Sequence, residues 1–310
     1  MAKPTLGMVG VGRMGSRMAA NLLNAGYGVT VYDVVPKFVE EMVAKGAKSA
    51  NSPKELASQV EVVLASLPGP PEVEAAFLGP EGIIAGAKPG TLLIDLTTVD
   101  PATSVKIGTA AAEKGLRFLD APVSGGVTGA QNATLTIMVG GEPAVFEEAL
   151  PIFQTIGKNI TNVGKTGAGS VVKLVNQLFV GVLSATVAEG MMLGTKWGVD
   201  PQVMYNVLST GFAGSTILTR HVTNFILKGD FEPGFTINLL SKDVWLGLTL
   251  GRDQNVPLDM LATASQILER AKAHGLGNKD MAAVILLWEK LLGVEVRSKQ
   301  AQQSGPAVGA

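Results

Sequence analysis

The sequence predicts an α/β protein with an N-terminal doubly wound (Rossmann) parallel sheet, followed by an all-α C-terminal domain joined to it by a long central helix. Short β-branched runs alternate with helical patterns in the first half of the chain, and a glycine-rich turn follows the first run. After residue 170 the patterns are helical only. A length of 310 residues also favours two domains over one.

The first domain is expected over residues 1–165. Its strands are predicted from short apolar runs at residues 5–9, 29–32, 60–65, 91–96, 117–120 and 134–139. Ligands of parallel sheets bind beyond the carboxyl ends of the strands. Residues 66–68, 97–98 and 124–126 fall at such ends.

The second domain is expected over residues 166–297, and residues 298–310, which are polar with glycine and proline, are expected to form a flexible tail. Helices are predicted at residues 170–195, 201–208, 215–227, 237–254, 257–274 and 280–291. The first half of the 170–195 helix is apolar nearly all round, so it must be surrounded. We expect this helix to form a central spine, and a partner subunit is one way to cover its apolar surface.

The glycine turn after the first strand has the spacing of a dinucleotide site, Gly10, Gly12 and Gly15. Gly10 allows the tight turn, Gly12 lets backbone approach a phosphate, and Gly15 lets the helix pack on the strand. Asp33 ends the next strand, where an acid accepts hydrogen bonds from ribose hydroxyls and repels a 2′-phosphate. The pattern therefore favours NAD(H) over NADP(H). The plain alternative is a βαβ unit with a glycine turn.

Composition excludes several classes of function. The net charge is −1, which gives no basis for nucleic-acid binding. There is no cysteine, and the two histidines, His221 and His274, form no ligand pattern, so no metal site is expected. His221 is expected at the surface or an interface. The uncharged run 174–188 is shorter than the ~20 residues of a membrane span, and no signal-peptide pattern begins the chain, so a cytoplasmic protein is expected.

A polar stripe interrupts the apolar central helix. Lys173, Asn176 and Gln177 stand at i, i+3 and i+4, so they share one face. A buried lysine without a partner is costly, and three polar groups in one stripe indicate a lined cavity. The alternative is a lysine that reaches solvent along the helix surface, with Asn176 bonded to a neighbouring carbonyl.

Three motifs in this order resemble the β-hydroxyacid dehydrogenase family (3-hydroxyisobutyrate dehydrogenase-like): the 10–15 turn, the 120–126 segment and the 167–177 segment. The resemblance covers Thr5 to about Val296. It implies an NAD(H)-dependent oxidoreductase that interconverts a small β-hydroxy acid and its semialdehyde, of tartronate semialdehyde reductase (2-hydroxy-3-oxopropionate reductase) or 3-hydroxyisobutyrate dehydrogenase type. The 2-(hydroxymethyl)glutarate and succinic semialdehyde/4-hydroxybutyrate dehydrogenases are the alternatives. It also implies a homodimer or homotetramer.

The resemblance assigns roles residue by residue. Lys173 is the implied catalytic acid/base. The implied substrate-binding residues are Ser124, Gly125, Gly126, Asn176, Phe235 and Asp243. The implied cofactor-binding residues are Gly10, Val11, Gly12, Arg13, Met14, Gly15, Asp33, Leu67, Pro68, Thr98 and Lys242. Two positions depart from the family pattern: Gln177 replaces a second asparagine, and Ala133 replaces a glycine. The first could alter substrate fit, and the second only a turn.

The roles suit hydride chemistry, because reduction of an aldehyde builds negative charge on oxygen that an ammonium can stabilise and then protonate. The 124–126 segment can form a backbone nest for a carboxylate. From spacing alone, Lys242 and Asp243 could equally form a solvated pair on a helix face. Two other functions stay open. Oxidative decarboxylation of the 6-phosphogluconate dehydrogenase type needs a cationic cluster that the sequence lacks, and a cofactor-bound interaction module would not need Lys173.

Overall fold

The computed structural model describes residues 3–298. The chain divides into two compact units, and the boundary between them falls between Val175 and Asn176. Residues 299–310, most of the expected tail, lie outside the described residues. Each unit is considered by itself below.

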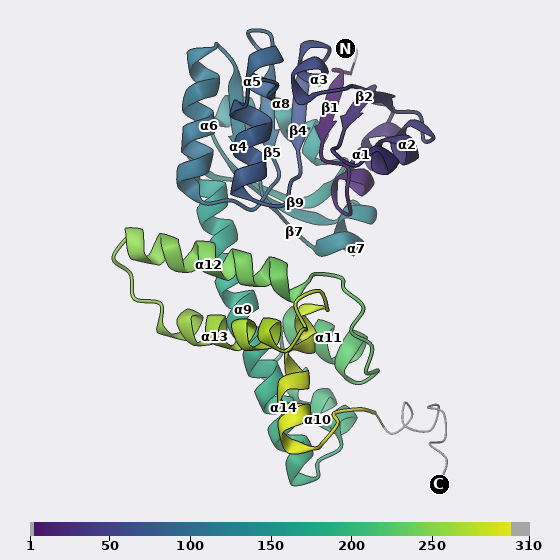
Figure 1. Cartoon of the computed structure of the whole chain (residues 1–310), viewed down its shortest axis with the longest axis vertical. Helices are drawn as coiled ribbons and strands as arrows, with labels where there is room; N and C mark the ends of the chain where they lie inside the picture. The colour runs from purple at the N-terminus through teal and green to yellow at the C-terminus, as the bar shows by residue number, and fades with distance from the viewer. Residues whose placement is uncertain (1–2, 299–310) are drawn as a thin grey trace. The chain divides into compact units, whose positions relative to one another are not determined.

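Within the described residues, the first unit holds a nine-stranded sheet (Figure 1). Its strands are β1 (Leu6–Val9), β2 (Val29–Tyr32), β3 (Lys48–Ser49), β4 (Val62–Ala65), β5 (Leu92–Asp95), β6 (Arg117–Asp120), β7 (Val123–Ser124), β8 (Leu135–Gly140) and β9 (Gly157–Gly164). The order is β3-β2-β1-β4-β5-β6-β8-β7, and β9 pairs with β8. Strands β1 to β6 are parallel, whereas β8 runs antiparallel to β6 and β7. The predicted fold class is confirmed.

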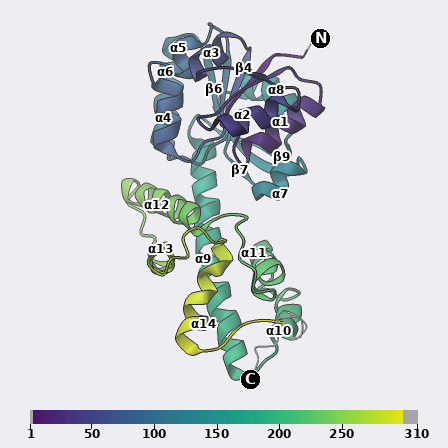
Figure 2. The same cartoon turned by 45° about the vertical axis from the view of Figure 1, so that its right-hand side comes forward.

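Eight helices of this unit are described: α1 (Gly15–Asn24), α2 (Pro36–Val43), α3 (Pro53–Ser58), α4 (Pro70–Leu78), α5 (Ile83–Gly86), α6 (Pro101–Glu113), α7 (Gly126–Gln131) and α8 (Pro143–Phe153). They form two layers because successive strand residues point to opposite faces. Val62 and Leu64 pack in a core with α1 and α8, whereas Val63 and Ala65 pack in another with α3, α4 and α6. Both views show α4 and α6 on one face and α1 and α8 on the other (Figures 1 and 2).

The second unit is helical. Its elements are the remainder of α9 (Ala168–Trp197), then α10 (Pro201–Leu208), α11 (Thr216–His221), a π-helical turn (Val222–Ile226), α12 (Ile237–Asp253), α13 (Asp259–Ala273), a 3₁₀ helix (Met281–Ile285) and α14 (Leu286–Leu292). Among its described residues the β-type pairing is one isolated bridge, between Thr236 and Asp280. The predicted single helix 215–227 is therefore an α-helix that widens into a π-helical turn, where Leu227 N–H reaches the Val222 carbonyl.

Helix α9 is longer than the uncharged run within it. The helix has 30 residues, and an 18-residue window within it has a mean hydropathy of 1.7. By length and composition alone such a helix could cross a membrane, but the core helix of a soluble protein meets the same criterion. Ala188, Met191 and Met192 are buried in the core of the second unit. Phe179 is 60% exposed and Leu193 is 75% exposed, so one chain does not surround the helix as its composition requires.

Candidate active site

The turn after β1 has the geometry that a dinucleotide's pyrophosphate needs. Gly10 has φ +85°, and a β-carbon there would overlap the Ser66 carbonyl oxygen after β4. A β-carbon at Gly15 would overlap the Gly10 carbonyl oxygen, whereas one at Gly12 would meet nothing within 4 Å. Helix α1 begins at Gly15 without a side-chain cap from Met14. Its first amides therefore fit an anion, beside the β1–β4 switch point.

Asp33, directly after β2, is tied to this turn. One carboxylate oxygen accepts from the Val11 backbone N–H at 2.8 Å, and the other accepts from the Val35 N–H at 2.9 Å. The sequence predicts an acid at this strand end but not the bond to Val11. Because the Val11 N–H donates to Asp33, this amide stabilises the turn and is not directed at a phosphate. The same hydrogen bond holds the carboxylate of Asp33 at the end of β2.

Leu67, Pro68 and Thr98 follow β4 and β5, two adjacent strands of the sheet. The Leu67 backbone N–H donates to the Thr97 hydroxyl at 3.0 Å, which joins the two loops. The structure thus brings these predicted cofactor residues to one edge of the sheet, near the glycine turn. Arg13 and Met14 lie in the turn itself.

The 124–126 segment has the backbone of an anion nest. Ser124 ends β7, Gly125 has φ +134° and Gly126 has φ +62°. Both glycines occupy conformations that other residues adopt only with strain. A β-carbon at Gly126 would meet nothing within 4 Å, so the backbone there is open to a ligand. The geometry suits a carboxylate.

Lys173 lies in the first two turns of α9 and is only 6% exposed. The start of that helix is held by Asp120, whose two carboxylate oxygens accept from the backbone N–H groups of Gly167 at 2.7 Å and Ser170 at 2.9 Å. Burial raises the pKa of Asp120, and these hydrogen bonds oppose the shift only in part. The Ser170 hydroxyl also lies 2.9 Å from that of Ser104 on α6. Sequence reasoning gave Asp120 no role, although a carboxylate that ends a buried strand is a signal for one.

In the second unit, four polar side chains from α9 and α12 form a chain. Asn176 donates to Gln177 at 2.9 Å, and Gln177 donates to Asp243 at 2.6 Å. Lys242 forms an ion pair with the other oxygen of Asp243 at 3.0 Å. Asp243 is 3% exposed, so the idea of a solvated surface pair with Lys242 is wrong. The structure places Lys242 with the predicted substrate residues of this unit.

Phe235 is half-buried in the segment before α12. The backbone N–H groups of Gly234 and Phe235 donate to one oxygen of Asp280, at 2.9 and 3.0 Å. Arg220 contacts both oxygens of that carboxylate, at 2.9 and 2.6 Å. Burial would raise the pKa of Asp280, but the hydrogen bonds and charge of Arg220 outweigh burial and hold it below its usual value. Asp280 thus fixes the segment that carries Phe235.

His221 is fully buried, so its expected surface position is wrong. Its Nε2 lies 2.9 Å from the Ser184 hydroxyl, which donates to the Val180 carbonyl at 2.7 Å. The hydroxyl proton is used in that second bond, so Nε2 is the donor. An Arg220 nitrogen, which can only donate, faces Nδ1 at 3.5 Å, so Nδ1 is the acceptor and the ring is neutral. Burial, and then the charge of Arg220, lower the pKa of His221 to about 3. His221 therefore has a structural role within the second unit.

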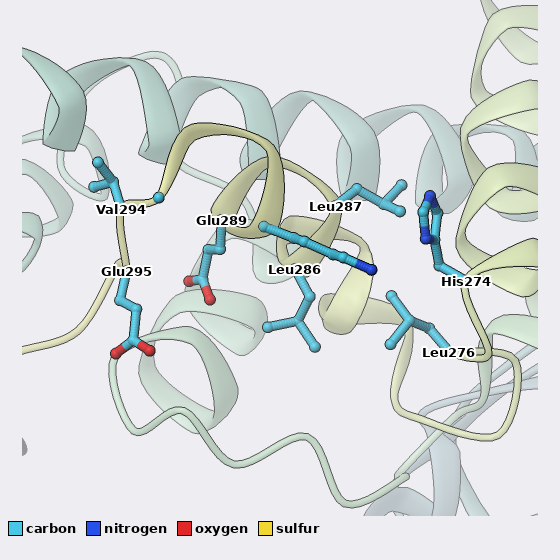
Figure 3. Close-up of a pocket in the computed structure, with 9 residues that line it drawn as sticks. His274, Leu276, Leu286, Leu287, Glu289, Val294 and Glu295 are labelled. Carbon is cyan, nitrogen blue, oxygen red and sulfur yellow. The ribbon is translucent and has the colours of Figure 1, made fainter. Parts of the chain in front are cut away.

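The second unit also holds a cavity of about 570 Å³ that contains none of the predicted site residues. In Figure 3, Leu286 and Leu287 line its middle, with His274 and Leu276 at one end and Val294 and Glu295 at the other. Glu289 in its wall is paired with Arg297 at 2.9 Å. Across residues 3–298, no three histidine, aspartate or glutamate side chains are grouped to hold a metal ion.

A doubly wound sheet with this glycine turn defines a dinucleotide-binding protein of the dehydrogenase type. Comparison with known proteins narrows the class. Residues 5–164 match the NAD binding domain of 6-phosphogluconate dehydrogenase, and residues 167–288 match the family described as NAD-binding of NADP-dependent 3-hydroxyisobutyrate dehydrogenase.

Individual relatives cover nearly the whole chain. The 2-(hydroxymethyl)glutarate dehydrogenase of Eubacterium barkeri is 42% identical over 95% of this chain and 98% of its own. The 2-hydroxy-3-oxopropionate reductase of Escherichia coli is 35% identical over 90% and 95%. The structure of Mycobacterium tuberculosis 3-hydroxyisobutyrate dehydrogenase with L-serine superposes with a TM-score of 0.86 at 29% identity, over 93% and 99%. The chain belongs to the β-hydroxyacid dehydrogenase family.

Family membership confirms an NAD-dependent oxidoreductase and a nicotinamide cofactor. The glycine turn fits that cofactor, because Gly12 leaves the space that a phosphate needs and the first amides of α1 carry no side-chain cap. The roles of individual residues and the identity of the acid stay predictions.

Proposed function

We propose that this enzyme interconverts a small β-hydroxy acid and its semialdehyde, with Lys173 as the acid/base. The observation that carries the proposal is a buried lysine on a helix whose first turn is fixed to the cofactor-binding sheet by Asp120. The nicotinamide, when bound, supplies or accepts the hydride. Lys173 stabilises the charge that develops on the carbonyl oxygen and delivers the proton to it.

The backbone nest at Ser124, Gly125 and Gly126 holds the substrate carboxylate. Asp120 lies four residues before Ser124, and its carboxylate holds the start of the lysine's helix. Asn176, Asp243 and Phe235 complete the substrate contacts. Lys242, Leu67, Pro68 and Thr98 line the cofactor's nicotinamide side.

The substrate we favour is of the tartronate semialdehyde or 3-hydroxyisobutyrate type. The Asn176–Gln177 pair supports the former. A second candidate is 2-(hydroxymethyl)glutarate, because the dehydrogenase for that acid is 42% identical to this chain over 295 residues. The held carboxylate of Asp33 favours NAD(H) over NADP(H), since it would repel a 2′-phosphate.

We infer a cytoplasmic homodimer or homotetramer that binds a small carboxylate, but no nucleic acid or membrane. Exposed apolar side chains on α9, α10 and α14 support a second copy of the chain as partner. They are Leu193, Trp197, Val203, Val207 and Leu291, each more than half exposed. Both views show these helices side by side (Figures 1 and 2).

The test follows NADH absorbance with tartronate semialdehyde and the other candidate semialdehydes. We expect Lys173→Ala to lower turnover by about 10²–10⁴ while the NADH dissociation constant stays within twofold. Lys196→Ala, an exposed lysine on the same helix, is the control and should match wild type. Near-normal turnover of Lys173→Ala would remove the lysine from the mechanism. Absence of wild-type turnover with every acid would favour an interaction module.

A further inference from the structure

The chain of polar side chains in the second unit has a fixed direction. Gln177 and Asp243 are each 3% exposed, so their hydrogen bonds cannot be exchanged for water. Asp243 pairs with Lys242 and is a carboxylate, which only accepts hydrogen bonds. The amide nitrogen of Gln177 must therefore face Asp243, and its carbonyl oxygen must face Asn176.

The orientation of Asn176 follows from this. Its amide nitrogen donates to the Gln177 oxygen at 2.9 Å, so its own carbonyl oxygen points away from Gln177. If the Asn176 amide were reversed, its carbonyl oxygen would lie against the carbonyl oxygen of the buried Gln177. Loss of a buried hydrogen bond of this kind is unfavourable enough to set one orientation.

We propose that Gln177 is a positioning residue that fixes the amide of Asn176, so that the Asn176 carbonyl oxygen is the acceptor for a hydroxyl of the bound acid. This rests on the proposed function, in which Asn176 contacts the substrate. Gln177 contacts both Asn176 and Asp243, and in this proposal its effect on the reaction passes through Asn176. An asparagine at position 177 is one carbon, or about 1.5 Å, shorter and would not span the distance to Asp243.

The first test is Gln177→Asn, which adds no charge. We expect kcat/KM for the hydroxy acid to fall at least tenfold, with the NADH dissociation constant and the melting temperature close to wild type. Gln202→Asn is the matched control, because Gln202 donates to Asn206 at 3.0 Å in the same unit but is exposed. Wild-type kcat/KM in Gln177→Asn would overturn the proposal.

The second test is a rescue. Gln177→Glu places an acceptor against Asp243, with Lys242 beside it and Lys173 one turn earlier on α9, and we expect kcat/KM to fall at least tenfold. Adding Asp243→Asn restores both hydrogen bonds, because the amide nitrogens of residues 176 and 243 can each donate to the new carboxylate. We expect kcat/KM of the double variant to rise at least threefold above that of Gln177→Glu alone, and to stay below wild type because Asp243→Asn also removes the ion pair with Lys242.

The double variant distinguishes the loss of the hydrogen bonds around Gln177 from the effect of an added negative charge. If the new charge beside Lys173 caused the loss, the double variant would be as impaired as the single one, and the proposal would fail. Wild type is assayed in parallel with each acid. No turnover by wild type defeats the proposed function, whereas active wild type with unaffected Gln177 variants defeats only this inference.

Discussion

The buried His221 predicts how the stability of the protein depends on pH. Its pKa is about 3 in the folded chain and about 6.5 when unfolded, chiefly because burial disfavours the charged ring. The unfolded chain therefore binds more protons between these values, and stability falls as pH decreases. The stabilising contribution is complete above pH 6.5 and is lost progressively toward pH 3.

The linkage relation gives the size of the effect. At pH 5, His221 carries a proton in most unfolded molecules and in almost no folded ones, which lowers the free energy of unfolding by about 2 kcal/mol relative to pH 8. Protonation in the folded state is opposed further by Arg220, whose nitrogen lies 3.5 Å from the ring's Nδ1. A loss of this size lowers the melting temperature by roughly 4–8 °C.

The assay compares melting temperatures of wild type and His221→Gln from pH 8 to pH 4. Glutamine can still donate to Ser184 but does not titrate, so the variant should be less stable at pH 8 and approach wild type as pH falls. His274→Gln, which removes the exposed histidine, should follow wild type in parallel. Parallel curves for wild type and His221→Gln would refute the reasoning.

Four further changes test the cofactor domain. Asp33→Ala should narrow the preference of kcat/KM for NADH over NADPH, and a wild type that already prefers NADPH would contradict the role of Asp33. Gly15→Ala should destabilise the protein by roughly 2 kcal/mol or more, seen as a lower melting temperature, because the added β-carbon would overlap the Gly10 carbonyl oxygen. Gly12→Ala should fold normally, because its β-carbon meets nothing, and should weaken NADH binding measured by calorimetry. Ala133→Gly should raise stability by about 1 kcal/mol in urea titrations, because Ala133 has φ +54°; no gain would show that the strain is absent.

The fold was predictable because burial on both faces of a parallel sheet leaves continuous apolar runs, as in β4 and β5. Strand β9 was missed for the opposite reason. Of residues 157–164 only Gly157 is buried, half of the residues are polar, and the strand pairs with one neighbour, so it carries no continuous apolar run. Strands β3 and β7 have only two residues each, which is too short for any periodicity.

The candidate site divides in the same way. Motif spacing locates the glycine turn and the acid after β2, because those parts are local in sequence. The position of His221 was mispredicted because its burial depends on Ser184, 37 residues away on another helix. A carboxylate at the end of a buried strand suggests a role for Asp120, but its partners on α9 lie about 50 residues away, so the local sequence does not identify them.

Gln177 shows what a departure from a family motif can mean once its contacts are known. In sequence it is a longer amide where a second asparagine is common, and either amide satisfies the pattern. Only the packing of α12 on α9, which brings Asp243 within 2.6 Å, gives the extra carbon a consequence. Because an acceptor-only group lies at one end of the chain, the direction of every hydrogen bond back to Asn176 is set. A single carboxylate 66 residues away from Gln177 thus sets the orientation of the Asn176 amide on which our proposal for substrate binding rests.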